Sequence, residues 1–303
     1  MNILSLEHLT HSYTERQLFD DADFYLHEGD KVGVIGINGT GKSTLLKIMA
    51  GLETPDEGQV IQASNLMIHY LPQNPEFSED DTVLQSVQNM VHHHANENEL
   101  IAAKAMLTRL GITDFEQKTR ELSGGQRKRL ALVSVLITPC DVLILDEPTN
   151  HLDSEMADWL ENKLQAFRGA LVMVTHDRYF LDSVTNKIIE LDKGKIYSYD
   201  EKYSGFLQRK AEREESARAS ERKRQSILRK EIEWISRGAR ARSTKQKAHI
   251  QRYEALKNQK APEVDEKLQL SSISSRMGKT TIEIENVSKA YGENTLICDF
   301  SAS

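Results

Sequence analysis

Residues 36–43 of the chain read Gly36-Ile37-Asn38-Gly39-Thr40-Gly41-Lys42-Ser43, a glycine-rich loop between the apolar run 31–35 and the helix-like stretch 44–50. A strand, a glycine loop and a helix in this order are typical of a phosphate-binding P-loop. The glycines let successive backbone N–H groups point at phosphate oxygens, and the positive end of the helix dipole strengthens the same field. The complete pattern favours a nucleoside triphosphate site over a glycine turn that binds nothing.

A second motif adds candidate ligands for the phosphates and for a metal ion. Lys42 can reach the β- and γ-phosphates, and the Ser43 hydroxyl can bind Mg²⁺. The apolar run 142–145 leads into Asp146 and Glu147, at the end of a predicted buried strand, where α/β sheets place their active sites. Asp146 can hold Mg²⁺, and Glu147 can orient or deprotonate an attacking water. The predicted nucleotide-binding residues of the loop are Gly36, Asn38, Gly39, Thr40, Gly41, Lys42, Ser43 and Thr44.

The overall composition fits one or two soluble domains, with 303 residues, 39% hydrophobic and 28% charged. No apolar run approaches the ~18–20 residues of a membrane span, and the N-terminus does not resemble a signal peptide, so we expect a cytoplasmic protein. Cys140 and Cys298 match no metal-binding spacing and are interpreted as inert thiols.

The net charge of −7 is distributed unevenly along the chain. Residues 209–260 contain 17 Lys/Arg and 7 Asp/Glu, whereas the rest of the chain contains 22 Lys/Arg and 39 Asp/Glu. Such an asymmetry indicates that one segment contacts an anionic partner, although charged runs are commonly just solvated helix faces.

Hydrophobic periodicity predicts an α/β fold for the first two thirds of the chain. Uniformly apolar runs at 31–35, 141–146 and 171–175 alternate with helical stretches, which predicts a parallel sheet that is covered on both faces. The stretches 3–9 and 23–27 alternate apolar and polar residues, as strands of an antiparallel edge sheet do.

The composition changes after Tyr199. Residues 203–235 carry dense alternating charge and no proline, which predicts a long solvated helix. A break at 237–238 precedes a second helical run, so the two are interpreted as an antiparallel helical hairpin with a basic, slender tip. The six basic residues of this tip are Arg237, Arg240, Arg242, Lys245, Lys247 and Arg252. A prong of this kind suits a phosphate backbone in a narrow space.

The last residues of the chain repeat the first. Residues 282–291 align with residues 4–13 at one constant offset, and Leu296 and Asp299 fall opposite Leu18 and Asp21 at the same offset. A chance similarity of two strand–turn stretches is the alternative. The simpler interpretation is a tandem protein of which this chain is the first half and the linker.

The hexapeptide 122–127, Leu-Ser-Gly-Gly-Gln-Arg, lies between the P-loop and the Asp146–Glu147 strand. Ser123 can cap a helix whose exposed N–H groups offer a second anion site. Together with the P-loop, the run 145–148 (Leu-Asp-Glu-Pro) and Thr175-His176-Asp177, it resembles the ABC-type ATPase domain over residues 3 to about 199. That resemblance implies a parallel core sheet, an antiparallel edge sheet and a helical subdomain.

The resemblance also implies roles for further residues. Tyr13 is expected to stack on adenine, Gln73 to contact Mg²⁺ and the attacking water, and His176 to contact the γ-phosphate. Two domains of this family enclose two ATP molecules, so the segment 122–127 is expected to serve the P-loop of a partner domain, either a second domain or another copy of the chain. The residues concerned are Ser123, Gly124, Gly125 and Gln126.

The tip sequence 237–247 is similar to the linker of the ABC-F family, and to its Uup-like branch in particular. Members of that family are tandem ATPases that bind the ribosome, and their linker approaches the peptidyl-site tRNA. The resemblance therefore implies rRNA and tRNA as partners, with ATP and Mg²⁺ as cofactors and no membrane subunit. It divides the chain into an ATPase domain (1–200), a basic helical-hairpin linker (201–260), a flexible tether (261–281) and the first strands of a truncated second ATPase domain (282–303).

The sequence thus predicts a ribosome-associated ATPase that hydrolyses ATP to ADP and phosphate, weakly in the absence of a partner domain. Two alternatives share its ATPase motifs. One is the ATP-hydrolysing subunit of a membrane transporter, which does not account for the basic hairpin or the repeat. The other is a DNA-processing coiled-coil ATPase, in which hundreds of residues of coil usually separate the two ATP motifs.

Overall fold

A six-stranded sheet organises the first of the two units into which the chain divides, residues 1–219 and 220–303. The structure is a computed structural model that describes residues 1–13, 16–90, 97–236, 253–257, 284–291 and 294–302. The strand order is β5-β6-β7-β3-β8-β9, parallel throughout except for the antiparallel pair β8–β9. The strands are β3 (Lys31–Ile35), β5 (Ile68–Leu71), β6 (Val142–Asp146), β7 (Ala170–Val174), β8 (Lys187–Asp192) and β9 (Lys195–Tyr199).

Both faces of this sheet are buried, which explains why the central strands β6 and β7 are buried at every position and are apolar except for Asp146 at the end of β6. Along β6, Val142 and Ile144 belong to one hydrophobic cluster, whereas Leu143 and Leu145 belong to another on the opposite face. Because side chains alternate along a strand, Asp146 falls on the same face as Val142 and Ile144. That is the face against which the helix after the P-loop packs.

An antiparallel sheet covers this face, with α1 (Lys42–Met49) between the two sheets. Its order is β2-β1-β4, from β1 (Asn2–Tyr13), β2 (Arg16–His27) and β4 (Glu57–Gln62). The side chains of Leu45, Leu46, Ile48 and Met49 are all fully buried. Both strands that we expected at 3–9 and 23–27 are present but longer than the sequence pattern indicates.

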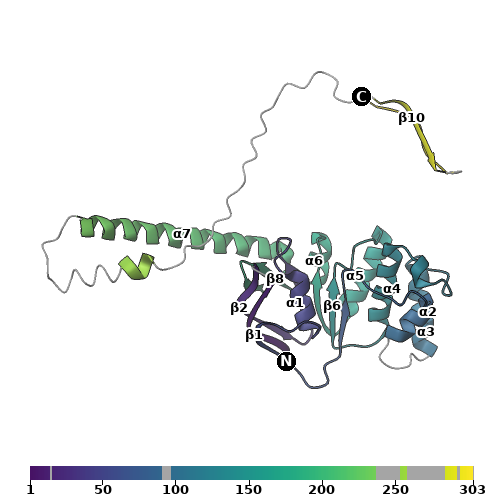
Figure 1. Cartoon of the computed structure of the whole chain (residues 1–303), viewed down its shortest axis with the longest axis horizontal. Coiled ribbons are helices and arrows are strands. Elements are labelled where there is room, and N and C mark those ends of the chain that lie inside the picture. The colour runs from purple at the N-terminus through teal and green to yellow at the C-terminus, as the bar shows by residue number, and fades with distance from the viewer. Residues whose placement is uncertain (14–15, 91–96, 237–252, 258–283, 292–293, 303) are drawn as a thin grey trace. The chain divides into compact units, whose positions relative to one another are not determined.

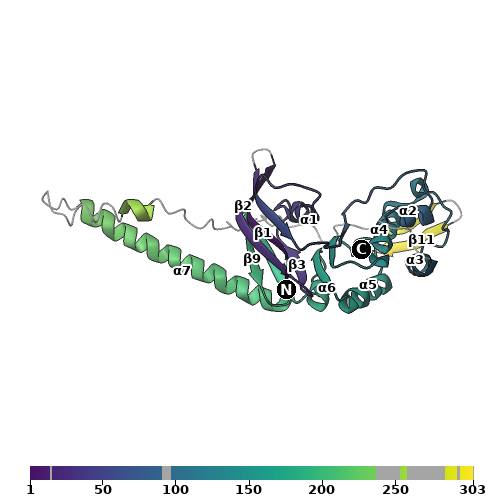
Figure 2. The same cartoon turned by 90° about the horizontal axis from the view of Figure 1, so that it is seen from below.

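Helices gather on the other face and at one end of the first unit (Figures 1 and 2). There α2 (Val83–Met90) and α3 (Glu97–Arg109) contact α4, which runs from Gly124 to Ile137. The remaining elements are the 3-10 turn η1 (Thr119–Glu121), α5 (Ser154–Ala166) and α6 (Arg178–Val184). The predicted α/β fold, with a parallel core sheet, an antiparallel edge sheet and a helical subdomain, is confirmed.

The long helix α7 (Tyr203–Ser236) begins against the edge of the main sheet. The buried Glu190 carboxylate of β8 accepts from Lys210 Nζ (2.5 Å) and from Arg213 Nη2 (2.9 Å). The Arg213 guanidinium also lies 3.7 Å from the ring centroid of Tyr197 on β9. These contacts fix the first turns of α7 to the first unit.

Replacing Glu190 with Ala is expected to lower the free energy of unfolding by about 2–3 kcal/mol, measured by urea denaturation. Loss of one member of a fully buried ion pair costs about 3–5 kcal/mol, and here Lys210 and Arg213 remain partly exposed. The control is Glu214→Ala, which removes a carboxylate from exposed pairs on α7 and should change stability by less than about 1 kcal/mol. Equal losses for the two variants would contradict the importance of the Glu190 cluster.

In the second unit, the chain returns to α7 after the tip. The Arg224 guanidinium of α7 is paired with Glu221 (2.7 Å) and donates to the backbone carbonyl of Leu256 (2.6 Å), in the helical stretch 253–257. The first arm of the predicted hairpin is therefore a helix, and a helical stretch after the tip lies against it. The tip residues Arg237, Arg240, Arg242, Lys245, Lys247 and Arg252 lie outside the described residues, as does the tether 261–281.

The strands β10 (Ile284–Tyr291) and β11 (Asn294–Ala302) repeat the pairing of β1 and β2. Val287 pairs with Phe300 as Leu9 pairs with Ala22. Left-handed backbone also recurs at equivalent places: His8, Asp21, Asn286 and Asp299 all have φ between 47° and 54°. The agreement in register and in these irregularities supports a repeat over a chance similarity. That the hairpin β10–β11 is the start of a second ATPase domain stays a proposal.

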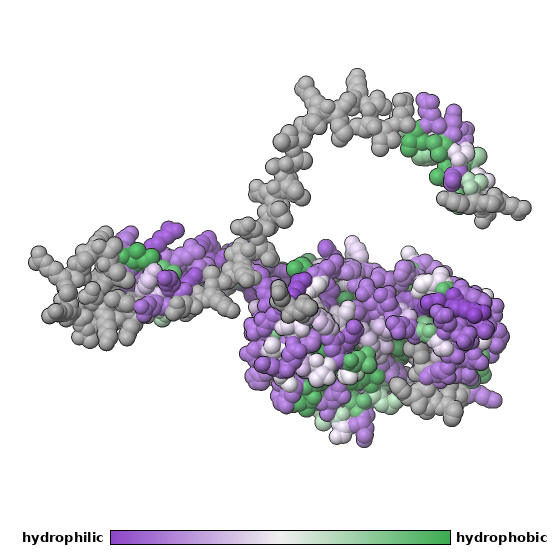
Figure 3. All heavy atoms as spheres, viewed as in Figure 1, coloured by the Kyte–Doolittle hydropathy of each residue, from purple (hydrophilic) through white to green (hydrophobic). Residues whose placement is uncertain are grey.

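Figure 3 shows that hydrophilic side chains cover most of the visible surface of the first unit and of α7. None of the helices among the described residues combines the length and apolar composition needed to cross a bilayer.

Candidate functional site

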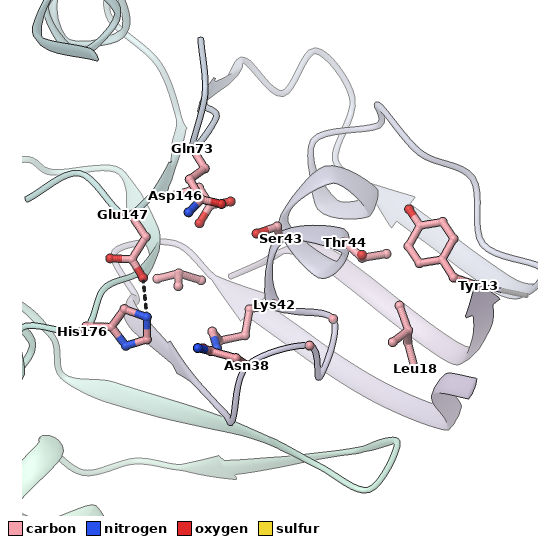
Figure 4. Close-up of a pocket in the computed structure, with 13 residues that line it drawn as sticks. Tyr13, Leu18, Asn38, Lys42, Ser43, Thr44, Gln73, Asp146, Glu147 and His176 are labelled. Carbon is pink, nitrogen blue, oxygen red and sulfur yellow. Dashed lines mark ion pairs between the residues drawn. The ribbon is translucent and has the colours of Figure 1, made fainter. Parts of the chain in front are cut away.

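The P-loop runs from the end of β3 into α1 and surrounds the N-terminus of that helix (Figure 4). Gly41 caps α1 in a left-handed conformation (φ 96°), and among the described residues no cap side chain bonds to the first N–H groups of the helix. At Gly36, a β-carbon would lie 2.6 Å from Thr40 Oγ1 and 2.9 Å from the Leu191 carbonyl, so only glycine fits there. The helix thus presents free donors, the arrangement that binds phosphate in P-loop proteins.

Lys42 lies beside this loop and close to the carboxylates at the end of β6. Its Nζ donates to the backbone carbonyls of Gly36 (2.8 Å) and Ile37 (3.2 Å). Burial lowers the pKa of Lys42, and the charges of Glu147 and Asp146 oppose that shift. The ammonium group is therefore held by weak neutral acceptors, which a phosphate oxygen could replace.

Asp146 and Glu147 form an acidic pair at the carboxyl end of β6, and both are almost fully buried. Glu147 Oε1 lies 3.4 Å from His176 Nε2, and burial raises the pKa of the Glu147 carboxyl. Glu147 has a positive φ of 53°, and its N–H donates to the Val174 carbonyl (2.8 Å). The Glu147 side chain lies beside His176 (Figure 4).

The oxygens of this pair also fit a hard cation. Among the described residues, Asp146 Oδ2 and Glu147 Oε2 are buried without a hydrogen-bond partner. Buried carboxylate oxygens without a donor indicate an absent ligand, because burial of an unpaired charge is costly. Together with the Ser43 hydroxyl and the Gln73 amide, Asp146 offers the all-oxygen set that Mg²⁺ prefers. Ser43, Gln73 and Asp146 thus fit a magnesium ion.

A cavity of about 420 Å³ brings most of the predicted nucleotide site together. Tyr13 and Leu18 lie toward one end and Glu147 and His176 toward the other, with Lys42 between them (Figure 4). The predicted residues that line it are Tyr13, Asn38, Gly39, Gly41, Lys42, Ser43, Thr44, Gln73, Asp146, Glu147 and His176. Gly36 and Thr40 shape the loop without lining the cavity. Its length from an aromatic end to an acidic end suits a nucleotide with its phosphates at the P-loop.

Sequence reasoning missed two lining residues, Leu18 and Val174. The position of Val174 at the cavity could have been predicted from the alternation of side chains along a strand. Val174 ends β7, pairs with Asp146 of β6 and therefore lies on the same face of the sheet. For Leu18 no signal in the sequence marks its approach to the P-loop, because the contact depends on how β2 crosses Gly41.

Tyr13 is held by a polar cluster that the sequence did not indicate. Its hydroxyl donates to Glu53, and its ring lies edge-on to the buried His11 at a centroid distance of 5.1 Å. His11 Nε2 in turn lies 3.0 Å from Glu53 Oε1. The hydrogen bond to Glu53 raises the pKa of Tyr13, which keeps the phenol neutral. A neutral ring fixed at the cavity mouth is suited to stacking on a base.

Replacing Tyr13 with Ala is expected to raise the dissociation constant for ATP about tenfold, because aromatic stacking on one base contributes about 1–3 kcal/mol. Isothermal titration calorimetry measures this directly. Tyr13→Phe keeps the ring, loses the hydrogen bonds of the hydroxyl, including the one to Glu53, and should bind within about threefold of the unaltered protein. Tyr25→Ala, at an exposed position on β2, is the matched control. Unaltered affinity in Tyr13→Ala would exclude this residue from the base site.

The segment 123–126 lies outside the cavity. Ser123 caps α4: its hydroxyl accepts from the N–H of Gln126, and the Gln126 side chain accepts from the N–H of Ser123 (2.9 Å). A β-carbon at Gly125 would lie 3.2 Å from His151 Cβ, whereas Gly124 has no heavy atom within 4 Å of its β-position among the described residues. The segment is therefore held by its own capping box and does not line the cavity at this chain's P-loop.

Lys128, four residues into α4, is a further residue that sequence reasoning missed. Its ammonium group is buried against the backbone of residues 72–73 and of Asp146. Burial lowers the pKa of Lys128 to about 8, an effect that the negative charge of Asp146 opposes.

Comparison with known proteins identifies the family. Residues 19–150 match a family model described as "ABC transporter", and residues 189–271 match a second model with the same description. The chain thus contains a domain of the ABC-type ATPase family. The ATPase domain that we predicted from the motif order is confirmed, and domains of this family bind ATP.

Among curated relatives of this ABC ATPase, the uncharacterized ABC transporter ATP-binding protein YfmR of Bacillus subtilis is 42% identical over 99% of the chain and 54% of YfmR. The energy-dependent translational throttle protein EttA is 35% identical in Haemophilus influenzae and 34% identical in Escherichia coli, over 95% of the chain and 59% of EttA in each case. The chain thus spans about half to three fifths of the length of these relatives.

Solved structures share the fold. The ATP-binding cassette MJ0796, in a dimeric post-hydrolysis state bound to ADP and Pi, superimposes with a TM-score of 0.58 at 24% identity, over 65% of this chain and 98% of that one. An ATP-binding subunit of an ABC transporter gives a TM-score of 0.59 at 20% identity, over 65% and 89% of the two chains.

Proposed function

We propose that the chain hydrolyses ATP in the cavity between the P-loop and the Asp146–Glu147 pair. The donors at the N-terminus of α1 and the Lys42 ammonium group bind the phosphates. Glu147 accepts a proton from the attacking water, and His176, 3.4 Å from it, contacts the γ-phosphate. Mg²⁺, when bound, neutralises charge on the phosphoryl group. The raised pKa of Glu147 brings this carboxylate closer to the basicity that a general base requires near neutral pH.

The site requires a partner. Ser123, Gly124, Gly125 and Gln126 lie outside the cavity, and we propose that they contact the ATP of an opposing ATPase domain. The opposing domain is either a second domain of a longer protein or another copy of this chain. A monomer should therefore bind ATP and hydrolyse it slowly.

We further propose that this ATPase is of the ABC-F kind, in the Uup-like branch, and acts on ribosomes. The observation that carries this proposal is the balance of 17 Lys/Arg to 7 Asp/Glu in residues 209–260 of an otherwise acidic chain. The similarity to EttA, whose name describes a translational throttle, supports it. In this proposal α7 carries the basic tip 237–252 toward rRNA and the peptidyl-site tRNA.

Neutralising the tip tests this proposal. We expect that a variant with Gln at all six positions no longer co-sediments with ribosomes, because each lost phosphate contact weakens binding to RNA. Its dissociation constant for ATP should stay within about twofold, because none of the six residues belongs to the proposed nucleotide site. The substituted residues are Arg237, Arg240, Arg242, Lys245, Lys247 and Arg252. A control that removes the same charge from exposed positions of the first unit should retain binding; its positions are Lys47, Lys104, Arg109, Arg120, Lys163 and Arg168.

Other outcomes would favour the alternatives. Tighter, salt-dependent binding to duplex DNA than to ribosomes would favour a DNA-processing ATPase. Co-purification with a membrane protein would favour the motor subunit of a transporter. Undiminished ribosome binding by the neutralised variant would contradict the proposed role of the tip.

A further inference from the structure

Lys128 makes an unusual set of contacts for a buried charge. Its side chain belongs to α4, the helix that begins at Ser123, and the residue is only 3% exposed. The ammonium group donates to the backbone carbonyls of Pro72 (2.6 Å), Gln73 (3.1 Å) and Asp146 (2.7 Å). All three of its protons are therefore used, and all three acceptors are main-chain oxygens.

The position of these carbonyls explains why a donor is needed there. The last residues that pair between the parallel strands β5 and β6 are Leu71 and Leu145. Pro72, Gln73 and Asp146 follow that pair in the chain. A buried carbonyl beyond the last paired residues of two strands needs a hydrogen-bond donor from elsewhere in the protein. One ammonium group satisfies three carbonyls from two chain segments, which a neutral hydroxyl or amide cannot do.

Two of these three carbonyls belong to residues that the proposed function places at the metal. Gln73 and Asp146 both line the cavity and offer side-chain oxygens to Mg²⁺, and their backbones meet at one lysine. That lysine lies on the helix whose first turn we assign to the ATP of the partner domain. α4 is thus connected by direct hydrogen bonds to the backbone of both ligands.

We propose that Lys128 is a positioning residue that holds Gln73 and Asp146 at the spacing needed for Mg²⁺ and transmits the position of α4 to them. This inference rests on the proposed nucleotide site. Its competitor is a purely structural role, in which Lys128 satisfies buried carbonyls and any loss affects folding alone.

The experiment compares ATP binding with and without the metal. Lys128→Met keeps the apolar stem and removes every donor, Lys128→Gln keeps two neutral donors, and Lys163→Met is the exposed-lysine control on α5. Titration calorimetry gives the ATP dissociation constant in EDTA and in excess Mg²⁺, and a thermal melt is recorded for each variant without nucleotide.

For Lys128→Met we expect affinity in EDTA within about twofold of the unaltered protein, with the gain in affinity on adding Mg²⁺ reduced about tenfold, as for residues that orient metal ligands. The gain for Lys128→Gln should lie between those of Lys128→Met and the unaltered protein, and the gain for Lys163→Met should match that of the unaltered protein. If Lys128→Met does not fold, Lys128→Gln gives the same comparison.

Two results would overturn the inference in distinguishable ways. A lower melting temperature with an undiminished Mg²⁺ gain in the Lys128 variants would leave only the structural role. Absence of ATP binding by the unaltered protein would remove the nucleotide site, and this inference with it.

Discussion

Replacing Glu147 with Gln is expected to lower the rate of ATP hydrolysis by about a hundredfold or more while leaving ATP affinity within about threefold. The amide cannot accept a proton from water, and general-base catalysis contributes about 10²–10⁴ to such reactions. The side chain keeps its size and its place beside His176 and the P-loop. Phosphate release measures the rate, and calorimetry measures the affinity.

The same variant should melt at a higher temperature in the absence of nucleotide. Burial raises the pKa of Glu147, so the folded protein holds this charge at a cost at every pH above the ordinary glutamate value of 4.5. A neutral amide removes that cost. Glu116→Gln, at an exposed position, is the control and should change neither property. Turnover at the parental rate in Glu147→Gln would contradict the role of this residue.

Mixing two inactive variants should restore activity if copies of the chain pair head to tail. Lys42→Met removes the phosphate-binding lysine and keeps an intact segment 122–127, whereas Ser123→Arg keeps the P-loop and blocks that segment. Each variant alone should be inactive. A two-fold symmetric interface contains two such sites. In a mixed dimer one of them combines the intact P-loop of one copy with the intact segment 122–127 of the other.

Random pairing predicts that about a quarter of the sites in an equal mixture are intact. Activity should also rise with protein concentration, which an ATPase assay over a dilution series measures. The control is a mixture of Lys42→Met with the doubly substituted chain, which contains no complete site. Brisk activity that does not depend on concentration would contradict the need for a partner.

The features that could be predicted from the sequence are those that depend on residues close together in the chain. The P-loop and the Asp146–Glu147 pair could be predicted because their chemistry depends on neighbours in the chain: a strand, a turn and a helix dipole in one case, and a strand end in the other. The length of β1 and β2 could not, because left-handed residues such as His8 and Asp21 carry these strands past points where the alternation breaks.

The contacts that position the site depend on the tertiary structure. Nothing in the run 126–129 indicates that Lys128 is buried while the neighbouring basic side chains are more exposed, because that depends on where β5 and β6 end beneath α4. Likewise, Glu53 is 40 residues from Tyr13, and only the fold brings its carboxylate to the phenol. The basic tip 237–252 lies outside the described residues, so its contact with RNA stays a prediction.

The most direct test of the account is the retention of Glu147→Gln on ribosomes, compared in ATP and in ADP, by sedimentation of the longest protein that the gene encodes. We propose that ATP held at the P-loop fixes a ribosome-bound state through α7 and its basic tip. We expect the variant to sediment with ribosomes in ATP and to be released in ADP. Equal sedimentation in the two nucleotides would contradict it.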